Sequence, residues 1–340
     1  MYSVVHKRKV GIQAGCPSSL LKNAATQCGQ ATGSYLRKDK LKSLTYDELR
    51  DNYLWDKEFS LNWLKEEGLI CSSQLCGHCG QNMKWTACDD RSDGFRWECR
   101  RTENGKKHRV EKSVREGSWF SKANLTIEEA IKFTYWWTRG LKQSQIKEQL
   151  GLGPNTAVDW DMFCREMCEV TLAERSEVLG GPGKIVQIDE SKIGKRKYHR
   201  GHMVEGQWVF GGIEEESRKC FIVAVENRTE DTLLTLIKKW IKPGTLIVSD
   251  CWKGYINLEK HGYEHRTVNH SKEFVNELGF HTNKIEGHWR QMKASLPTHG
   301  RRKAHYDSYL AEFLWRYMNR GEDLFWVFLK DMKRDFNLKE

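Results

Sequence analysis

The fold is decided within residues 184–293, where three short phrases each carry an acid: Gln187-Ile188-Asp189-Glu190-Ser191, Val248-Ser249-Asp250-Cys251-Trp252 and His281-Thr282-Asn283-Lys284-Ile285-Glu286-Gly287. Asp189 and Asp250 each follow a short apolar run typical of a strand, and Glu286 lies in a segment typical of a helix. We expect the three carboxylates to converge at one edge of a sheet. Such oxygen ligands suit Mg²⁺ or Mn²⁺, and two such ions can run phosphoryl transfer.

Acid spacing alone is a weak signal. The chain has 46 Asp and Glu residues, and most acids in proteins lie on the solvated surface. The phrases around these acids carry more information. Two of them resemble Merlin-type DDE transposases and their bacterial insertion-sequence relatives: Gly206-Gln207-Trp208-Val209-Phe210-Gly211-Gly212-Ile213-Glu214 and His281-Thr282-Asn283-Lys284-Ile285-Glu286-Gly287-His288-Trp289.

The resemblance runs from about Leu44 to about Asp331 and is most specific across Lys184–Lys293. It implies an α/β chain whose catalytic domain is an RNase H-like mixed sheet flanked by helices. It also implies that the substrate is double-stranded DNA, namely terminal inverted repeats that are cut and joined to target DNA. The working unit would then be a homo-oligomer that pairs two transposon ends.

The 340 residues are enough for a core domain and smaller modules, and Gly180-Gly181-Pro182-Gly183 is the clearest linker. We therefore expect six segments. They are a basic disordered arm (1–42), a helical lead-in (43–70), a zinc-ribbon-like module (71–120), a helix-turn-helix-like helical module (121–179), the RNase H-like catalytic domain (184–300) and a C-terminal helical closure (301–340).

Capping boxes at Thr45–Glu48 and Thr126–Glu129 predict two helix starts. A helix at Gln143–Leu150, a turn with glycine, and a helix from Thr156 have the layout of a helix-turn-helix, which can place its last helix in a major groove. That last helix is rich in acids, which counts against groove entry. The alternative is a module that only positions the catalytic domain.

Cys76-Gly77-His78-Cys79-Gly80 predicts half of a zinc site, because two thiolates on a tight turn can face one metal ion. Cys99 supplies a third ligand, and His108 is the nearest residue of a suitable type for the fourth. The resemblance also implies a Cys-plus-His second half. Three other residues remain candidates, each of which can equally be an ordinary loop or core residue: Cys71, His78 and Cys88.

The formal net charge is +10 and the isoelectric point about 9.0, which favours polyanionic partners. Alternatively, these cations form a solvated rim or surface ion pairs. The residues we expect to contact DNA are Arg100, Arg101, Lys106, Lys107, Arg109, Lys192, Lys195, Arg196, Lys197, Arg290, Lys293, Arg301 and Arg302. Beside Glu286, His281 and Asn283 can support the metal site through hydrogen bonds.

No run of eighteen apolar residues occurs, and no signal-peptide core is found. We expect a soluble, intracellular protein without a membrane partner, located in the nucleus if its host is a eukaryote. The overall interpretation is a DDE transposase that uses two Mg²⁺ or Mn²⁺ ions and a structural Zn²⁺. Two alternatives remain: a domesticated DNA-binding protein that retains the scaffold, and an RNase H-like nuclease without joining activity.

Overall fold

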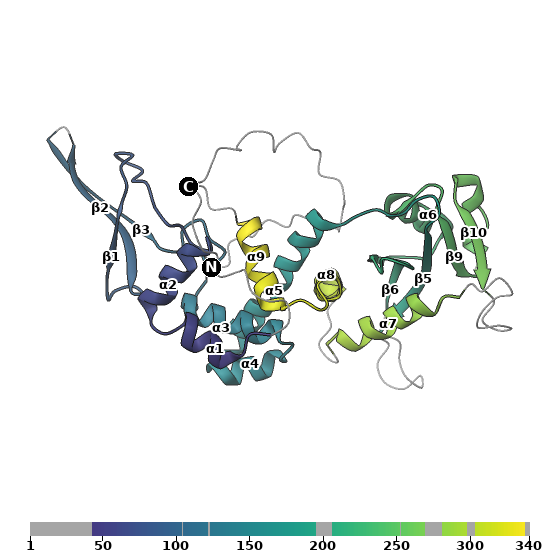
Figure 1. The fold of residues 1–340 in the computed structure, drawn as a ribbon, viewed down its shortest axis with the longest axis horizontal. Coiled ribbons are helices and arrows are strands. Elements are labelled where there is room, and N and C mark those ends of the chain that lie inside the picture. The colour runs from purple at the N-terminus through teal and green to yellow at the C-terminus, as the bar shows by residue number, and fades with distance from the viewer. Residues whose placement is uncertain are drawn as a thin grey trace. The chain divides into compact units, whose positions relative to one another are not determined.

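The computed structural model describes residues 43–103, 105–121, 123–194, 206–251, 253–268, 281–297 and 303–336. The chain forms two compact units, whose elements are labelled in Figure 1. One unit contains Cys168–Met318, and the other contains the described residues up to Met167 and from Asn319 onward. Among the described residues, no helix combines the length and the apolar character needed to span a bilayer.

The unit that ends at Met167 and resumes at Asn319 is mainly helical and carries one small sheet. Its elements are α1 (Tyr46–Tyr53), α2 (Lys57–Glu66), β1 (Lys84–Ala87), β2 (Phe95–Glu103), β3 (Lys106–Ser113), α3 (Ile127–Thr138), α4 (Gln143–Leu150), the first part of α5 (Pro154–Arg175) and α9 (Leu324–Asp335).

Both predicted capping boxes are confirmed. At α1 the Thr45 hydroxyl accepts from the backbone N–H of Glu48, whose carboxylate accepts from the Thr45 N–H in return. Thr126 and Glu129 make the same exchange at α3. The helix α5 begins at Pro154, two residues earlier than predicted, because proline is suited to a first helical turn, where no N–H is needed.

The small sheet is antiparallel with strand order β1-β2-β3. Its buried side includes Met83, Trp97 and Cys99, together with Cys76 from the preceding turn. Trp97 is only 4% exposed, so its ring serves the core of this module and is not available to stack on a ligand.

The unit Cys168–Met318 is built around a five-stranded mixed sheet. Its main elements are β4 (Leu179–Gly180), β5 (Ile185–Ile193), β6 (Gln207–Glu214), β7 (Cys220–Val225), α6 (Glu230–Trp240), β8 (Ile241–Lys242), β9 (Leu246–Asp250), β10 (Glu264–Val268), α7 (Asn283–Ser295) and α8 (Tyr306–Met318). The sheet order is β10-β9-β5-β6-β7. β5, β6 and β7 pair antiparallel, whereas β9 and β10 run parallel to β5. The expected mixed α/β class is confirmed.

Two strands of the five-stranded sheet differ from the sequence expectation. The prediction that the first strand ends at Asp189 is wrong, because β5 continues to Ile193 and pairs with β6 over that whole length. β10 was not predicted at all. It is an edge strand in which only Val268 is fully buried, so it lacks the apolar alternation that identifies a strand.

Side chains alternate between the two faces of β5. Val186 and Ile188 pack in one hydrophobic cluster with Leu233 and Ile237 of α6. Residues at the intervening positions of β5 hydrogen-bond with α7. The two helices therefore cover opposite faces of the sheet in this unit (Figure 1).

Candidate active site

Two of the three predicted acids lie at matching positions on the neighbouring strands β5 and β9. Gln187 of β5 and Val248 of β9 form the last parallel pair between these strands. Asp189 and Asp250 each lie two residues farther along. Because residues two apart on a strand point to the same face, both carboxylates lie on the face of Gln187, where α7 packs.

Asp189 is held by α7, the helix that carries Glu286. The indole Nε1 of Trp289, on α7, donates a hydrogen bond to Asp189 Oδ2 at 2.9 Å. Gly211, the partner of Asp189 on β6, makes room for this ring: a Cβ there would lie 2.7 Å from Trp289 Cη2. Sequence reasoning gave Trp289 no role. Trp289 lies three residues after Glu286, so both are on one helix face, and this spacing could have indicated that Trp289 faces the site.

Burial raises the pKa of Asp189 to about 7, and the nearby charge of Glu190 adds to this effect. The Trp289 hydrogen bond acts in the opposite direction and lowers the pKa. A carboxyl with this pKa is about half protonated at pH 7, and a bound cation would favour its ionised form.

Glu190 is a second acid that sequence reasoning missed. Its side chain is only 4% exposed and lies 4.0 Å from the Arg228 guanidinium. The Tyr255 hydroxyl, in the 3-10 turn Lys253–Tyr255 that follows β9, donates a hydrogen bond to it. Burial raises the pKa of Glu190. This pair ties the segment after Asp250 to β5, and no spacing in the sequence indicates it.

Glu286 lies in the first turn of α7, where the Thr282 hydroxyl approaches Glu286 Oε1 at 3.3 Å. The two predicted supporting residues, His281 and Asn283, differ in their surroundings. Nδ1 of His281 lies 3.3 Å from Gln187 Nε2, whereas Asn283 is the exposed first residue of the helix.

The donor set of the three acids fits hard divalent cations. Among the described residues, both groups of three or more ligand side chains that fit within 4.8 Å lie in the β1–β3 module. The three acids are therefore spread more widely.

The four predicted zinc ligands lie together in the β1–β3 module: Cys76, Cys79, Cys99 and His108 have ligand atoms within 4.8 Å of one another. Cys79 and Cys99 Sγ are 3.8 Å apart. His108 Nε2 lies 3.7 Å from Cys76 Sγ and 3.4 Å from Cys99 Sγ. A zinc tetrahedron with standard bond lengths has edges of about 3.8 Å between sulfurs and about 3.6 Å between sulfur and nitrogen, so the residues fit zinc.

The thiols of Cys76 and Cys99 have different pKa values. Backbone N–H groups of Cys79 and His78 lower the pKa of Cys76 to about 6, and burial beside the other thiols raises the pKa of Cys99 to about 11. A bound cation would favour thiolates at all three positions.

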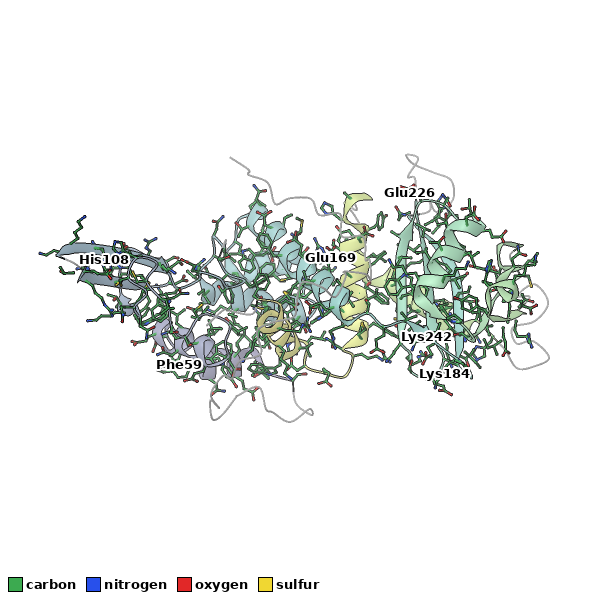
Figure 2. All side chains as sticks on the ribbon, turned by 90° about the horizontal axis from the view of Figure 1, so that it is seen from above. Phe59, His108, Glu169, Lys184, Glu226 and Lys242 are labelled. Carbon is green, nitrogen blue, oxygen red and sulfur yellow. The ribbon has the colours of Figure 1, made fainter. Side chains whose placement is uncertain are left out.

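Of the spare candidates, Cys71 instead approaches the Glu116 carbonyl at 3.7 Å, and the His78 ring stacks on His108. Figure 2 shows His108 within this sheet.

The predicted DNA contacts on the β2–β3 hairpin fall into two groups. Arg100 and Arg109 both bind the carboxylate of Glu98, at 2.8 and 3.0 Å. Arg101, Lys106 and Lys107 are exposed nearer the tip, where Arg101 donates to the Asn82 carbonyl. Within the described part of the hairpin, no carboxylate binds this second group, so it carries more of the net positive charge.

Of the other predicted DNA contacts, Lys192 places its ammonium 5.3 Å from the centre of the Trp208 ring. Arg290 and Lys293 are exposed on α7. The expected basic arm 1–42 lies outside the described residues. So do the remaining predicted DNA contacts, which are Lys195, Arg196, Lys197, Arg301 and Arg302.

In the helical module, α3, α4 and α5 follow one another with short turns, as predicted. Asp161 of α5 accepts a hydrogen bond from Trp137 at 3.1 Å and pairs with Arg165, which is only 6% exposed. These groups stabilise the module internally. Groove binding by α5 stays a prediction.

Comparison with known proteins identifies the unit that carries the three acids. The ISXO2-like transposase domain matches residues 178–318. A transposase-like protein of Haemophilus influenzae is 31% identical over 102 residues, which are 30% of this chain and 82% of that protein.

Among solved structures, the HTLV-2 integrase catalytic core domain in complex with magnesium is 14% identical, with a TM-score of 0.26 over 43% of this chain and 90% of that chain. A chain of a simian T-cell lymphotropic virus intasome is 15% identical, with a TM-score of 0.27 over 56% and 68%. These TM-scores are too low to carry an argument. The sequence matches are sufficient: the chain belongs to a family of insertion-sequence transposases, and its residues 178–318 match the ISXO2-like transposase domain.

Proposed function

We propose that the protein is a metal-dependent DNA transposase in which Asp189, Asp250 and Glu286 hold two Mg²⁺ or Mn²⁺ ions. The observation that carries the proposal is that Asp189 and Asp250 lie at matching positions of β5 and β9, on the sheet face that α7 covers. The ions would supply activation of water or of a DNA 3′ hydroxyl and stabilisation of the leaving oxygen.

The chain's own residues prepare the site for these cations. Trp289 binds one oxygen of Asp189 and so fixes the direction of the carboxylate. The raised pKa of Asp189 means that a bound cation would compete with a proton for this carboxylate. Tyr255 and Glu190 hold the segment that follows Asp250. Together these contacts orient the acids before DNA arrives, which is what a positioned phosphoryl-transfer site requires.

Zn²⁺ at Cys76, Cys79, Cys99 and His108 would be structural, since four protein ligands leave no open position for substrate. The β1–β3 module that it stabilises would present Arg101, Lys106 and Lys107 to DNA phosphates. Phosphate contacts position a protein but do not read sequence. Recognition of particular DNA ends would therefore need base contacts from this module or from α3–α5.

The finer expectations belong to the same proposal. Three antiparallel strands joined by two parallel ones support an RNase H-like catalytic domain. The Merlin-type phrases support terminal inverted repeats and target DNA as substrates, and a homo-oligomer that pairs two ends. The proposed domain limits are those expected from the sequence.

The test is cleavage and strand transfer by the full chain on DNA carrying the repeats that flank its gene, with Mg²⁺, Mn²⁺ or chelator. We expect metal-dependent joining that Glu286→Gln abolishes, while DNA binding survives. Cleavage without joining of pre-cut ends would indicate a nuclease. Binding without cutting in both proteins would contradict the proposal and indicate a domesticated DNA-binding protein.

A further inference from the structure

The helix that carries Glu286 begins without a cap from its own N-cap residue. The Thr282 side chain caps no helix N–H group and points instead to Glu286. The first N–H groups of any helix lack intrahelical partners and need acceptors from elsewhere. In α7, the backbone N–H groups of Lys284 and Ile285 both donate to Oε1 of Gln187, at 3.1 and 3.2 Å.

Gln187 lies in the middle of β5 and is 0% exposed. Its amide nitrogen donates to Glu215 Oε1 at 2.6 Å and lies 3.3 Å from His281 Nδ1. A glutamine amide offers two donor hydrogens and two acceptor lone pairs, and here each has a partner. The side chain therefore joins the strand β5, the turn after β6 and the start of α7.

The contacts of Gln187 and Trp289 form two anchors between β5 and α7. Gln187 and Asp189 are separated by about 6.6 Å along a strand that rises about 3.3 Å per residue. Their partners, Ile285 and Trp289, are separated by about 6 Å along a helix that rises about 1.5 Å per residue. The two spacings match, so α7 can follow β5 with both anchors closed. Glu286 lies between them.

We propose that Gln187 is a positioning residue of the active site: its amide fixes the first turn of α7 on β5 and so sets Glu286 relative to Asp189. This inference rests on the proposed function for its catalytic consequence. The anchoring itself rests only on the hydrogen bonds described above, so the two can be tested separately.

The decisive variants exploit the donor and acceptor pattern. Gln187→Glu keeps the acceptor for the two helix N–H groups but sets a second buried carboxylate against Glu215. Adding Glu215→Gln restores a donor–acceptor pair with the roles exchanged, and Glu215→Gln alone leaves an amide that can still accept from Gln187. Thr229→Ala is the matched control, because it removes the cap of α6 on the opposite face.

Two quantities are measured on the full chain: hydrogen exchange of peptides covering 283–289, and the rate of metal-dependent DNA cleavage. We expect Gln187→Glu to expose the amides of 283–289 and to slow cleavage on the order of 100-fold, the cost of a displacement of about 1 Å in an active site. The exchanged pair should recover both quantities. Thr229→Ala should leave them near wild type, and Glu215→Gln alone, which removes the 3.6 Å ion pair between Glu215 and Lys284, should change them less than Gln187→Glu.

Unchanged exchange at 283–289 in Gln187→Glu would overturn the inference, as would wild-type cleavage by a variant whose first turn of α7 is exposed. Failure of the exchanged pair to recover either quantity would also overturn it. An inactive wild type in which the exchange pattern still follows these variants would instead reject the proposed function and leave the anchor established.

Discussion

The chain contains two groups of metal-ligand side chains, and they are built in opposite ways. The Cys/His group draws its ligands from one module, between Cys76 and His108, and their atoms lie within 4.8 Å of one another. The acids come from β5, β9 and α7. Trp289 donates a hydrogen bond to Asp189, and Gln187 accepts hydrogen bonds from the first turn of α7. The first arrangement suits an ion that stabilises a fold, and the second suits ions that must also bind substrate.

The largest expected effect separates the two groups directly. Cys99→Ser should remove zinc and unfold the β1–β3 module, because structural zinc contributes a large part of the stability of a small domain. Zinc content and limited proteolysis measure this. Cys71→Ser is the control in the same module and should retain one zinc per chain. Zinc retained by Cys99→Ser would show that the ligand set is wrong.

The next largest effect concerns how the stability of the unit with the three acids depends on pH when no divalent metal is bound. Because the folded-state pKa of Asp189 is raised to about 7, its contribution to stability is fully present below the unfolded pKa of about 4 and is lost as pH rises through 7. At pH 8 the ionised Asp189 therefore lowers the free energy of unfolding by at most about 4 kcal/mol. In Mg²⁺-free buffer, Asp189→Asn should therefore raise the melting temperature of this unit more at pH 8 than at pH 5.

Exposed Asp231, in the first turn of α6, gives the matching control, since Asp231→Asn should not raise the melting temperature at pH 8. Mg²⁺ should also stabilise wild type more at pH 8 than at pH 5, because the cation competes with a proton. An Asp189→Asn variant with the same pH profile as wild type would show that Asp189 is an ordinary ionised acid.

A smaller effect is expected for the indole that holds Asp189. Trp289→Phe removes a hydrogen bond to a carboxylate, which is worth about 1.5–3 kcal/mol, so cleavage should slow about tenfold or more. The pKa of Asp189 should rise further, so the rate should reach its plateau at a higher pH. Trp240→Phe, on the opposite face, should lower stability without shifting the pH–rate profile. An unshifted profile in Trp289→Phe would remove this role.

The smallest effects should arise at the hairpin. Replacing Arg101, Lys106 or Lys107 by Ala should reduce the slope of log affinity against log salt by about 0.9 for each phosphate that the variant no longer neutralises. Arg100→Ala should reduce it less, because Glu98 already binds that guanidinium. Fluorescence anisotropy between about 50 and 200 mM salt measures both slopes. Equal slopes for all four variants would contradict the division into two groups.

The sequence allowed the local features to be predicted and missed those formed by long-range packing. Capping boxes at Thr45 and Thr126 depend on residues three apart, and the Cys/His group lies within one small module. The strands that carry Asp189 and Asp250 could be recognised from short apolar runs, but β10 could not, because pairing at the sheet edge and not apolar character determines it.

In the candidate site, the three acids could be selected from their phrases, but their support could not. Gln187 is bonded to residues 97 and 98 positions away, and Glu190 to Tyr255 at a separation of 65. No local pattern encodes these contacts. A buried glutamine or glutamate next to a strand acid looks the same in sequence as an exposed one, until the helix or turn that packs on it is known.

We propose that the acids do the chemistry while the zinc module and its cations bind DNA. The decisive measurement is cleavage of end-bearing DNA by zinc-loaded Asp250→Asn, with DNA affinity determined on the same sample. We expect metal-dependent cleavage to fall by about 10²–10³-fold or more, with zinc content and affinity unchanged. Cleavage at the wild-type rate by this variant would show that Asp250 takes no part in the reaction.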